Sequence, residues 1–359
     1  MTAQIITVAS IIGAITAVLM GVGSVRYNHK MLLRLGLGLL CISAVGCALA
    51  KNFLMMLLAF SLYGLATAIV LPILFAMVGE HFHLKQRAYA LGWVFTGGSL
   101  AFLISAPVIG LIADLGGWRW AFLGVMLPAP LVGFILVTIC IPSTVRYSSS
   151  SGSLKQHLEG FREIFTRRSA VACLLSSALN SAAYIALELY GTQFLRERFL
   201  VSLGFISVVT FYFLGGSSSF IVGYQVGGRI VPRFGRKPIT IVTAIIAGSC
   251  IIAFMNMPNL LLFFTFAFLS CMFLGIMGTS LGSLTLEQIP DFRGTIMSLD
   301  SAAGFMGGAI GAGVGGIVLL LWNYTEVGLV LGAMSLISAL LVYFVVIDTT
   351  NSMSHNEPI

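Results

Sequence analysis

The sequence predicts an all-α polytopic membrane protein built from two pseudo-symmetric helical bundles. Composition is the first observation: 58% of the 359 residues are hydrophobic and 9% are charged, whereas about 25% of residues are charged in a typical soluble domain. The second is a series of apolar stretches near the ~20 residues that a membrane-spanning helix needs. The third is an internal repeat. Because backbone polar groups must be satisfied within lipid, we expect every span to be helical.

Eleven apolar stretches, separated by loops with charged residues, glycine or proline, are the expected spans. They cover about 4–25, 31–49, 53–78, 89–113, 119–141, 169–193, 203–228, 238–256, 259–285, 294–322 and 326–347. We therefore divide the chain into an N-terminal bundle (1–141), a cytoplasmic linker (142–168), a C-terminal bundle (169–347) and a cytoplasmic tail (348–359).

The repeat relates landmarks of the two bundles at a nearly constant offset. The matched pairs are Gly21 and Gly228, Arg26 and Arg233, Lys30 and Lys237, and Glu80 and Glu287, all 207 residues apart, followed by Arg87 and Arg293, 206 apart. A repeat of this length in a hydrophobic chain indicates a transporter built from two homologous halves.

Basic residues fall mostly on one side of the expected spans. Of the 19 lysines and arginines, 15 lie in one set of loops and ends and four in the other, so the positive-inside rule places the first set and the C-terminus in the cytoplasm. The basic residues lie in short loops between spans, which argues against nucleic acid as a partner. We therefore expect them to lie beside the lipid bilayer. The repeat also predicts a helix before residue 1, the partner of span 169–193, so we expect a first helix missing through a late start site or a real truncation.

The linker combines a serine-rich stretch with a predicted helix. Leu154, Leu158, Phe161 and Phe165 recur at helical spacing among basic residues, which favours an amphipathic helix on the inner leaflet. An ordinary solvated linker helix is the alternative.

The segment from Gly228 to Pro238 carries a basic glycine and arginine pattern. Its glycines and cations, namely Gly228, Arg233, Gly235, Arg236 and Lys237, resemble the loop signature of the major facilitator superfamily; Gly21, Arg26 and Lys30 form a weaker copy. The resemblance implies twelve spans in two six-helix bundles, of which this chain holds the second to the twelfth. Pro232 and Val25 stand where that family has an aspartate.

Two interpretations of this loop remain open. Its glycines allow a tight turn between helices, and its cations meet headgroups and helix C-terminal carbonyls. These contacts either hold one end of the transport cavity closed, in which case Arg233→Ala slows conformational exchange, or only fix the topology.

A second resemblance lies in span 89–113. Gly97, Gly98, Pro107 and Gly110 resemble a degraded form of the glycine and proline signature of antiporters in similar families. Close helix packing through small residues explains them equally well. Phe60 occupies the position of that family's fourth-helix arginine, so proton coupling through such an arginine is not expected.

Ionisable residues within spans are costly and are candidates for function. Asn180, Tyr184 and Glu188 are spaced by four and share a helix face, which we expect to line the cavity, with Glu188 binding a proton or another cation. Alternatively, Glu188 pairs with Arg196 or Arg198. Asp300 is the second candidate carboxylate, or else it pairs with the basic inner loops.

The six cysteines lack paired spacing and read as small apolar residues. No catalytic constellation, phosphate motif or dinucleotide motif stands out, so we expect no enzyme activity, no metal and no cofactor. The predicted function is secondary active transport of a small solute by alternating access across the plasma membrane, as proton-coupled efflux. An uptake permease for a metabolite and a truncated, non-transporting membrane partner are the alternatives.

Overall fold

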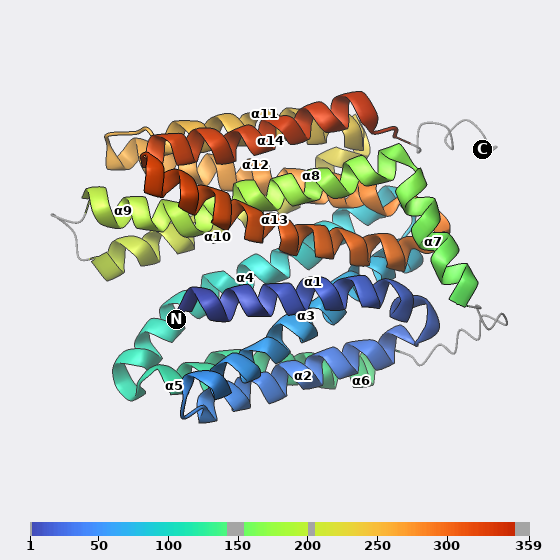
Figure 1. Ribbon diagram of the computed structural model, residues 1–359, viewed down its shortest axis with the longest axis horizontal. Coiled ribbons are helices and arrows are strands. Elements are labelled where there is room, and N and C mark those ends of the chain that lie inside the picture. Colours follow the sequence, from blue (N-terminus) through green and yellow to red (C-terminus); the bar gives the residue numbers. More distant parts are fainter. Residues whose placement is uncertain (1, 142–153, 200–204, 349–359) are drawn as a thin grey trace. The chain divides into compact units, whose positions relative to one another are not determined.

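The computed structural model describes residues 2–141, 154–199 and 205–348, and these are almost entirely helical (Figure 1). The first part contains α1 (Thr2–Arg26), α2 (His29–Leu49), α3 (Phe53–His81), α4 (Leu84–Gly116), α5 (Trp118–Ala121), the π-helix η1 (Phe122–Met126) and α6 (Pro128–Cys140). The second contains α7 (Leu154–Thr166), α8 (Arg168–Ile185), the π-helix η2 (Ala186–Tyr190) and α9 (Gly191–Phe199). The third contains α10 (Phe205–Phe234), α11 (Arg236–Phe254), α12 (Leu260–Leu286), the 3-10 helix η3 (Pro290–Phe292), α13 (Arg293–Leu321) and α14 (Tyr324–Val345).

Within the described residues, each predicted span overlaps one of these helices or a continuous run of them, which confirms the all-α polytopic fold. Within the described part of the chain, nine helices are long and apolar enough to cross a membrane, and α1 adds a shorter apolar stretch, Val8–Met20. Apolar side chains of α6 such as Leu136 and Ile139 are exposed. Exposed apolar side chains on a spanning helix are suited to contact with lipid.

The chain forms two compact units. Unit 1 comprises Met1–Glu80, Ser105–Thr166 and Asp291–Met306; unit 2 comprises His81–Ile104, Arg167–Pro290 and Gly307–Ile359. Helices α4 and α13 therefore each contribute one part to each unit. Because these units follow contacts and not sequence order, the division into bundles at residue 141 stays a prediction.

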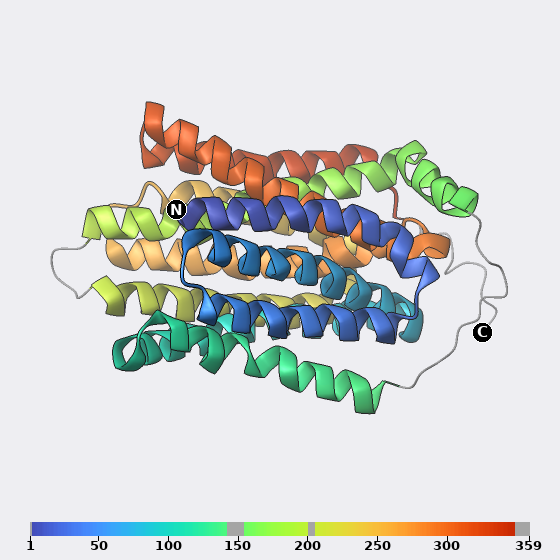
Figure 2. The same ribbon diagram turned by 60° about the horizontal axis from the view of Figure 1, so that its bottom comes forward.

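Unit 1 is held together by small residues between α1, α2 and α3. A Cβ atom at Gly64 of α3 would lie 2.1 Å from the carbonyl oxygen of Ala9 in α1, so these two helices touch backbone to backbone. Leu33 and Ile73 are fully buried beside them. The run from α5 to α6 lies beside α2 in both views (Figures 1 and 2).

Helix α7 confirms that the linker contains a helix. Its exposed face includes Phe165, while Ile164 is fully buried and a Cβ at Gly160 would lie 2.8 Å from the Phe292 ring. The side chains of Leu154 and Leu158 lie outside the described residues, so the predicted apolar face stays a prediction. Binding of this helix to the inner leaflet stays a prediction.

Unit 2 has the larger core, built on α8, α10, α11, α12 and α14. Phe254 and Phe263 are fully buried at its centre, with their ring centroids 5.4 Å apart. Helices α11 and α14 run side by side (Figure 1), with a Cβ at Gly248 only 2.8 Å from the Gly332 carbonyl oxygen. The Ser335 hydroxyl donates to the Ala244 carbonyl oxygen across this contact, at 2.9 Å.

The basic segment at Gly228 is more helical than expected. Helix α10 continues through Gly228 and Pro232 to Phe234, and only Gly235 makes the turn, with φ of +87°. Pro232 lies in the last turn of the helix, where it cannot donate the usual hydrogen bond to the carbonyl oxygen four residues earlier, and the helix ends two residues later. Gly228 has another role, because a Cβ there would lie 3.0 Å from the Cα atom of Tyr89 in α4.

Candidate transport site

A cavity of about 50 Å³ lies inside unit 2, between α4, α8, η2, α10 and α12. Polar groups on its wall come from four helices: Ser99 of α4, Tyr184 of α8, Glu188 of η2, and Tyr212 and Ser217 of α10. Aromatic side chains and the Cys271 thiol of α12 complete the wall. The cavity is therefore a mixed polar and aromatic chamber with one carboxylate.

The carboxylate is carried by a local change of helix type. Helix α8 becomes the π-helix η2 at Ala186, and the N–H of Gly191 donates to the Ala186 carbonyl oxygen five residues earlier. The Tyr212 hydroxyl donates to the carbonyl oxygen of Leu187 at 2.7 Å. Single-turn π-helices occur frequently at functional sites, and this one places Leu187 and Glu188 side by side on the cavity wall.

Two further contacts hold η2 in place. A Cβ at Gly191 would lie 2.5 Å from the Tyr212 hydroxyl oxygen, so a glycine is required where that hydroxyl reaches the backbone. On another side, the Tyr190 hydroxyl donates to the Ala312 carbonyl oxygen of α13 at 2.6 Å. The π-turn is thus fixed by two tyrosines from within unit 2, which orients Glu188.

The Glu188 side chain is partly buried at the cavity wall. Among the described residues, no hydrogen bond or ion pair reaches its carboxylate. In particular, the alternative pairing with Arg196 or Arg198 is not formed; the guanidinium carbon of Arg198 lies 5.7 Å from the Phe194 ring centroid instead. A carboxylate inside a membrane span is retained at a cost, which makes this group the main candidate for function.

Of the other predicted site residues within spans, one lines the cavity with Glu188 and two do not. Tyr184 lines the cavity beside Glu188, and its ring meets Phe220 edge to face with centroids 5.5 Å apart. Asn180 lies one helical turn away and is not part of the described cavity wall; its Oδ1 atom is buried without a hydrogen-bond partner. Asp300 is partly buried in the part of α13 that belongs to unit 1. The structure therefore brings together Tyr184 and Glu188 within one cavity.

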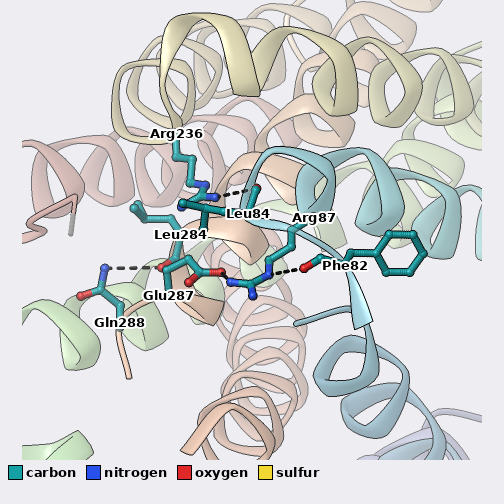
Figure 3. Close-up of polar contacts among 7 residues, drawn as sticks. All are labelled: Phe82, Leu84, Arg87, Arg236, Leu284, Glu287 and Gln288. Carbon is teal, nitrogen blue, oxygen red and sulfur yellow. Dashed lines mark hydrogen bonds and ion pairs between the residues drawn. The ribbon is translucent and has the colours of Figure 1, made fainter. Parts of the chain in front are cut away.

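A second polar cluster lies where α4 begins and α12 ends, both within unit 2 (Figure 3). The Arg87 guanidinium forms an ion pair with the Glu287 carboxylate and donates from Nε to the Phe82 carbonyl oxygen at 3.0 Å. Their side chains are 12% and 5% exposed, respectively. Arg87 and Glu287 are both landmarks of the repeat, so an arginine from one copy meets a glutamate from the other.

The loop motif contributes one residue to this cluster. Arg236 is buried and donates from Nη2 to the Leu84 carbonyl oxygen of α4 at 3.2 Å (Figure 3). Arg233 is exposed and Lys237 partly buried. Arg236 therefore meets a backbone carbonyl within unit 2, and contact of Arg233 and Lys237 with lipid headgroups stays a prediction.

The weaker motif copy is located in α1 and α2. Gly21 and Arg26 lie in α1, where their side chains are outside the described set, and the turn falls at Tyr27 and Asn28. The Lys30 ammonium donates to the Ile141 carbonyl oxygen within unit 1. This copy ties α2 to the end of α6.

The four residues of the antiporter-like motif all lie in α4. A Cβ at Gly97 or Gly98 would meet no atom within 4 Å, so close packing does not explain these glycines. Pro107 is accommodated inside the helix. Gly92, which the motif does not include, makes the close contact instead, with a Cβ placed 2.7 Å from the Tyr224 carbonyl oxygen of α10.

Sequence reasoning missed most of the cavity wall. Ser99, Tyr212, Ser217 and Cys271 are single polar or thiol side chains in apolar helices, and only their spatial convergence marks them. The Arg87–Glu287 pair had a usable signal, because both residues mark the repeat.

Comparison with known proteins agrees with the fold and with the family signature. A profile described as "Major Facilitator Superfamily" matches residues 1–224 and 200–358. The "Uncharacterized MFS-type transporter YwfA" of Bacillus subtilis is 23% identical over 327 residues, which are 89% of this chain and 77% of that protein. A "Probable 4-methylmuconolactone transporter" of Cupriavidus pinatubonensis is 26% identical over 257 residues, 70% of this chain and 59% of that protein.

Among solved structures, the human organic anion transporter MFSD10 (TETRAN) superimposes with a TM-score of 0.78 at 16% identity, over 94% of this chain and 83% of that one. This likeness supports the fold alone. The profile match over nearly the whole sequence decides the family: the chain is a multi-pass membrane protein that belongs to the Major Facilitator Superfamily of solute transporters.

Proposed function

We propose that this chain is a secondary active transporter that exports a small organic solute across the plasma membrane by alternating access, in exchange for protons. Membership of a transporter family supports transport of a small solute. One observation carries the finer proposal: Glu188, which no described ion pair or hydrogen bond neutralises, lies on the wall of a cavity inside membrane-spanning helices.

Glu188 is the proposed coupling group because it can hold either a proton or a solute. The other titratable groups on the described wall are the Tyr184 and Tyr212 hydroxyls and the Cys271 thiol. The Tyr212 hydroxyl already donates a hydrogen bond to the Leu187 carbonyl oxygen. Tyrosine and cysteine titrate in the alkaline range in water, so a carboxylate is the better proton carrier near neutrality.

The Arg87–Glu287 cluster supports alternating access. It joins the start of α4 to the end of α12 through charged groups that are nearly excluded from water. A buried ion pair is costly to form, and separating its two charges within a buried environment is also costly. It therefore favours a protein that is either in a state with the pair formed or in a state without it. We propose that it stabilises one of the two transport states. In this proposal the C-terminus and the linker are cytoplasmic.

The test uses inside-out membrane vesicles from cells that express the full chain. The vesicles are incubated with a cell extract, and the solutes that enter them are identified by mass spectrometry. With an acidic lumen, wild-type vesicles should accumulate at least one extract solute, and a protonophore should abolish this accumulation. Glu188→Gln should abolish it as well. Glu197→Gln, an exposed glutamate on α9, is the matched control and should transport normally.

Equal accumulation by the wild type and Glu188→Gln would overturn the coupling role. Gradient-driven accumulation only in right-side-out vesicles would replace export by uptake. If no solute accumulates in either orientation while the protein is correctly inserted, transport itself is refuted for this chain.

A further inference from the structure

We propose that the group recognised in the Glu188 cavity is a small organic cation, an ammonium carrying short alkyl groups. This inference rests on the proposed function, in that it takes the cavity to be the solute site. The proposal is carried by the charge of the wall, its aromatic side chains and its size.

The charge of the wall selects against anions. Glu188 is the single charged side chain among the described residues that line the cavity, and lysine, arginine and histidine are absent from that described wall. A carboxylate or phosphate of a solute would therefore meet a like charge without a compensating cation, in a place where burial of unpaired charge is strongly unfavourable. A cationic solute supplies the positive charge that the described wall lacks as a partner for Glu188.

The aromatic side chains favour an organic cation. Phe220 meets Tyr184 edge to face and stacks on Tyr224, with centroids 5.5 and 5.8 Å apart. Tyr224 in turn stacks on Phe95 at 5.2 Å. This chain of rings is packed from α8 across α10 to α4. Tyr184 and Phe220 are its members on the cavity wall, and the packing holds their side chains in place before the solute arrives. Alkylammonium groups are recognised by such aromatic surroundings through cation–π attraction.

The donor set argues against a bare metal ion. Calcium takes six to eight oxygen ligands, usually several of them carboxylates, whereas this wall offers one carboxylate. In the described part of the chain, no cluster of three or more histidine, cysteine, aspartate or glutamate side chains could hold a metal. An alkylated ammonium needs fewer direct ligands, because much of its surface is apolar.

The size of the cavity sets how much of the solute it takes. Its volume of about 50 Å³ exceeds the ~10–15 Å³ that a cavity needs to hold one water molecule. The cavity therefore has room for a group larger than one water molecule, such as an ammonium head group. Phe102 on the wall is 52% exposed, so the remainder of the solute would leave the cavity past this ring.

The experiment measures binding to the purified full chain in maltoside micelles, which contain no ammonium group. Three probes share one shape: choline is cationic, 3,3-dimethylbutan-1-ol replaces its ammonium nitrogen by carbon, and 3,3-dimethylbutanoate is anionic. Isothermal titration should show saturable choline binding, with at least ~10-fold weaker binding of the neutral alcohol, a ratio that corresponds to about 1.4 kcal/mol, and no binding of the anion.

Variants identify the residues responsible. Glu188→Gln should lower choline affinity to that of the neutral alcohol and leave the alcohol's own affinity unchanged, which also shows that the cavity is intact. Glu197→Gln should bind choline like the wild type. Phe220→Leu should weaken choline more than the alcohol.

The cation proposal is overturned if choline does not bind, if the alcohol or the anion binds equally well, or if Glu188→Gln binds choline normally. Loss of proton-driven flux in Glu188→Gln together with absent choline binding would refute the cation and leave the proposed function standing. Choline binding without flux in either vesicle orientation would refute the proposed function and leave the cation site standing.

Discussion

Glu287 and Arg87 are 200 positions apart in the sequence, yet their side chains form an ion pair that is largely shielded from solvent. Removing one partner of such a pair leaves the other charge buried and uncompensated, which typically costs about 3–5 kcal/mol. We expect Glu287→Gln to lower the thermal unfolding midpoint strongly. The measurement is thermal unfolding of the purified protein in detergent micelles.

The double variant Arg87→Met with Glu287→Gln is the control, because it removes both charges together, and Arg87→Met alone completes the cycle. It should be clearly more stable than Glu287→Gln, and the double-mutant cycle should give a coupling well above zero. Additive losses would show that the two side chains do not stabilise each other.

Arg236 offers a contrast at the same scale: the motif marks it and Arg233 alike, but only Arg236 is buried.

At the scale of elements, α13 shows how glycine spacing builds a helix contact. Gly307, Gly311 and Gly315 are four residues apart, and a Cβ at the first two would lie 2.0 and 2.6 Å from the carbonyl oxygens of Ala178 and Ala182 in α8. Gly307→Ala must therefore push the two helices apart. We expect a destabilisation of about 1–3 kcal/mol, the usual cost of overpacking, measured as a lower unfolding midpoint.

Gly313 supplies the control on the same helix, since a Cβ there meets nothing within 4 Å. Gly313→Ala should be neutral or stabilising by up to about 1 kcal/mol, because alanine favours the helix. An equal loss in both variants would mean that flexibility of the glycine run, and not close packing, explains its composition.

The helices themselves were predictable because length and hydropathy determine a span in lipid. Two local features were not. The π-helix at Ala186–Tyr190 is held by the Tyr190 hydroxyl, which reaches the Ala312 carbonyl oxygen, and by the Tyr212 hydroxyl, which reaches the Leu187 carbonyl oxygen. The extension of α10 through Pro232 comes with close packing of Gly228 against Tyr89. Both are set by neighbours distant in sequence, which a hydropathy pattern does not contain.

At the scale of the whole molecule, the candidate site was predictable only through its carboxylate, because ionisable residues are rare in membrane spans. Glu188 stood out because a carboxylate in a span is costly, and Tyr184 followed from helical spacing. Ser99, Ser217 and Cys271 are common in apolar helices, so their membership of the wall depends on how α4, α10 and α12 meet. Asn180 obeys the same spacing as Tyr184, yet the described cavity ends before it.

The distribution of basic residues gives the last prediction, which concerns orientation in the membrane. With 15 of 19 basic residues on one side of the predicted spans, the positive-inside rule places that side in the cytoplasm. Reporter insertions at the C-terminus and near Ser150 should behave as cytoplasmic, giving fluorescent green fluorescent protein and inactive alkaline phosphatase. Insertions after Lys51 and near Ser202 should give active phosphatase. The opposite pattern at all four positions would invert the molecule and reverse the direction of the proposed exchange.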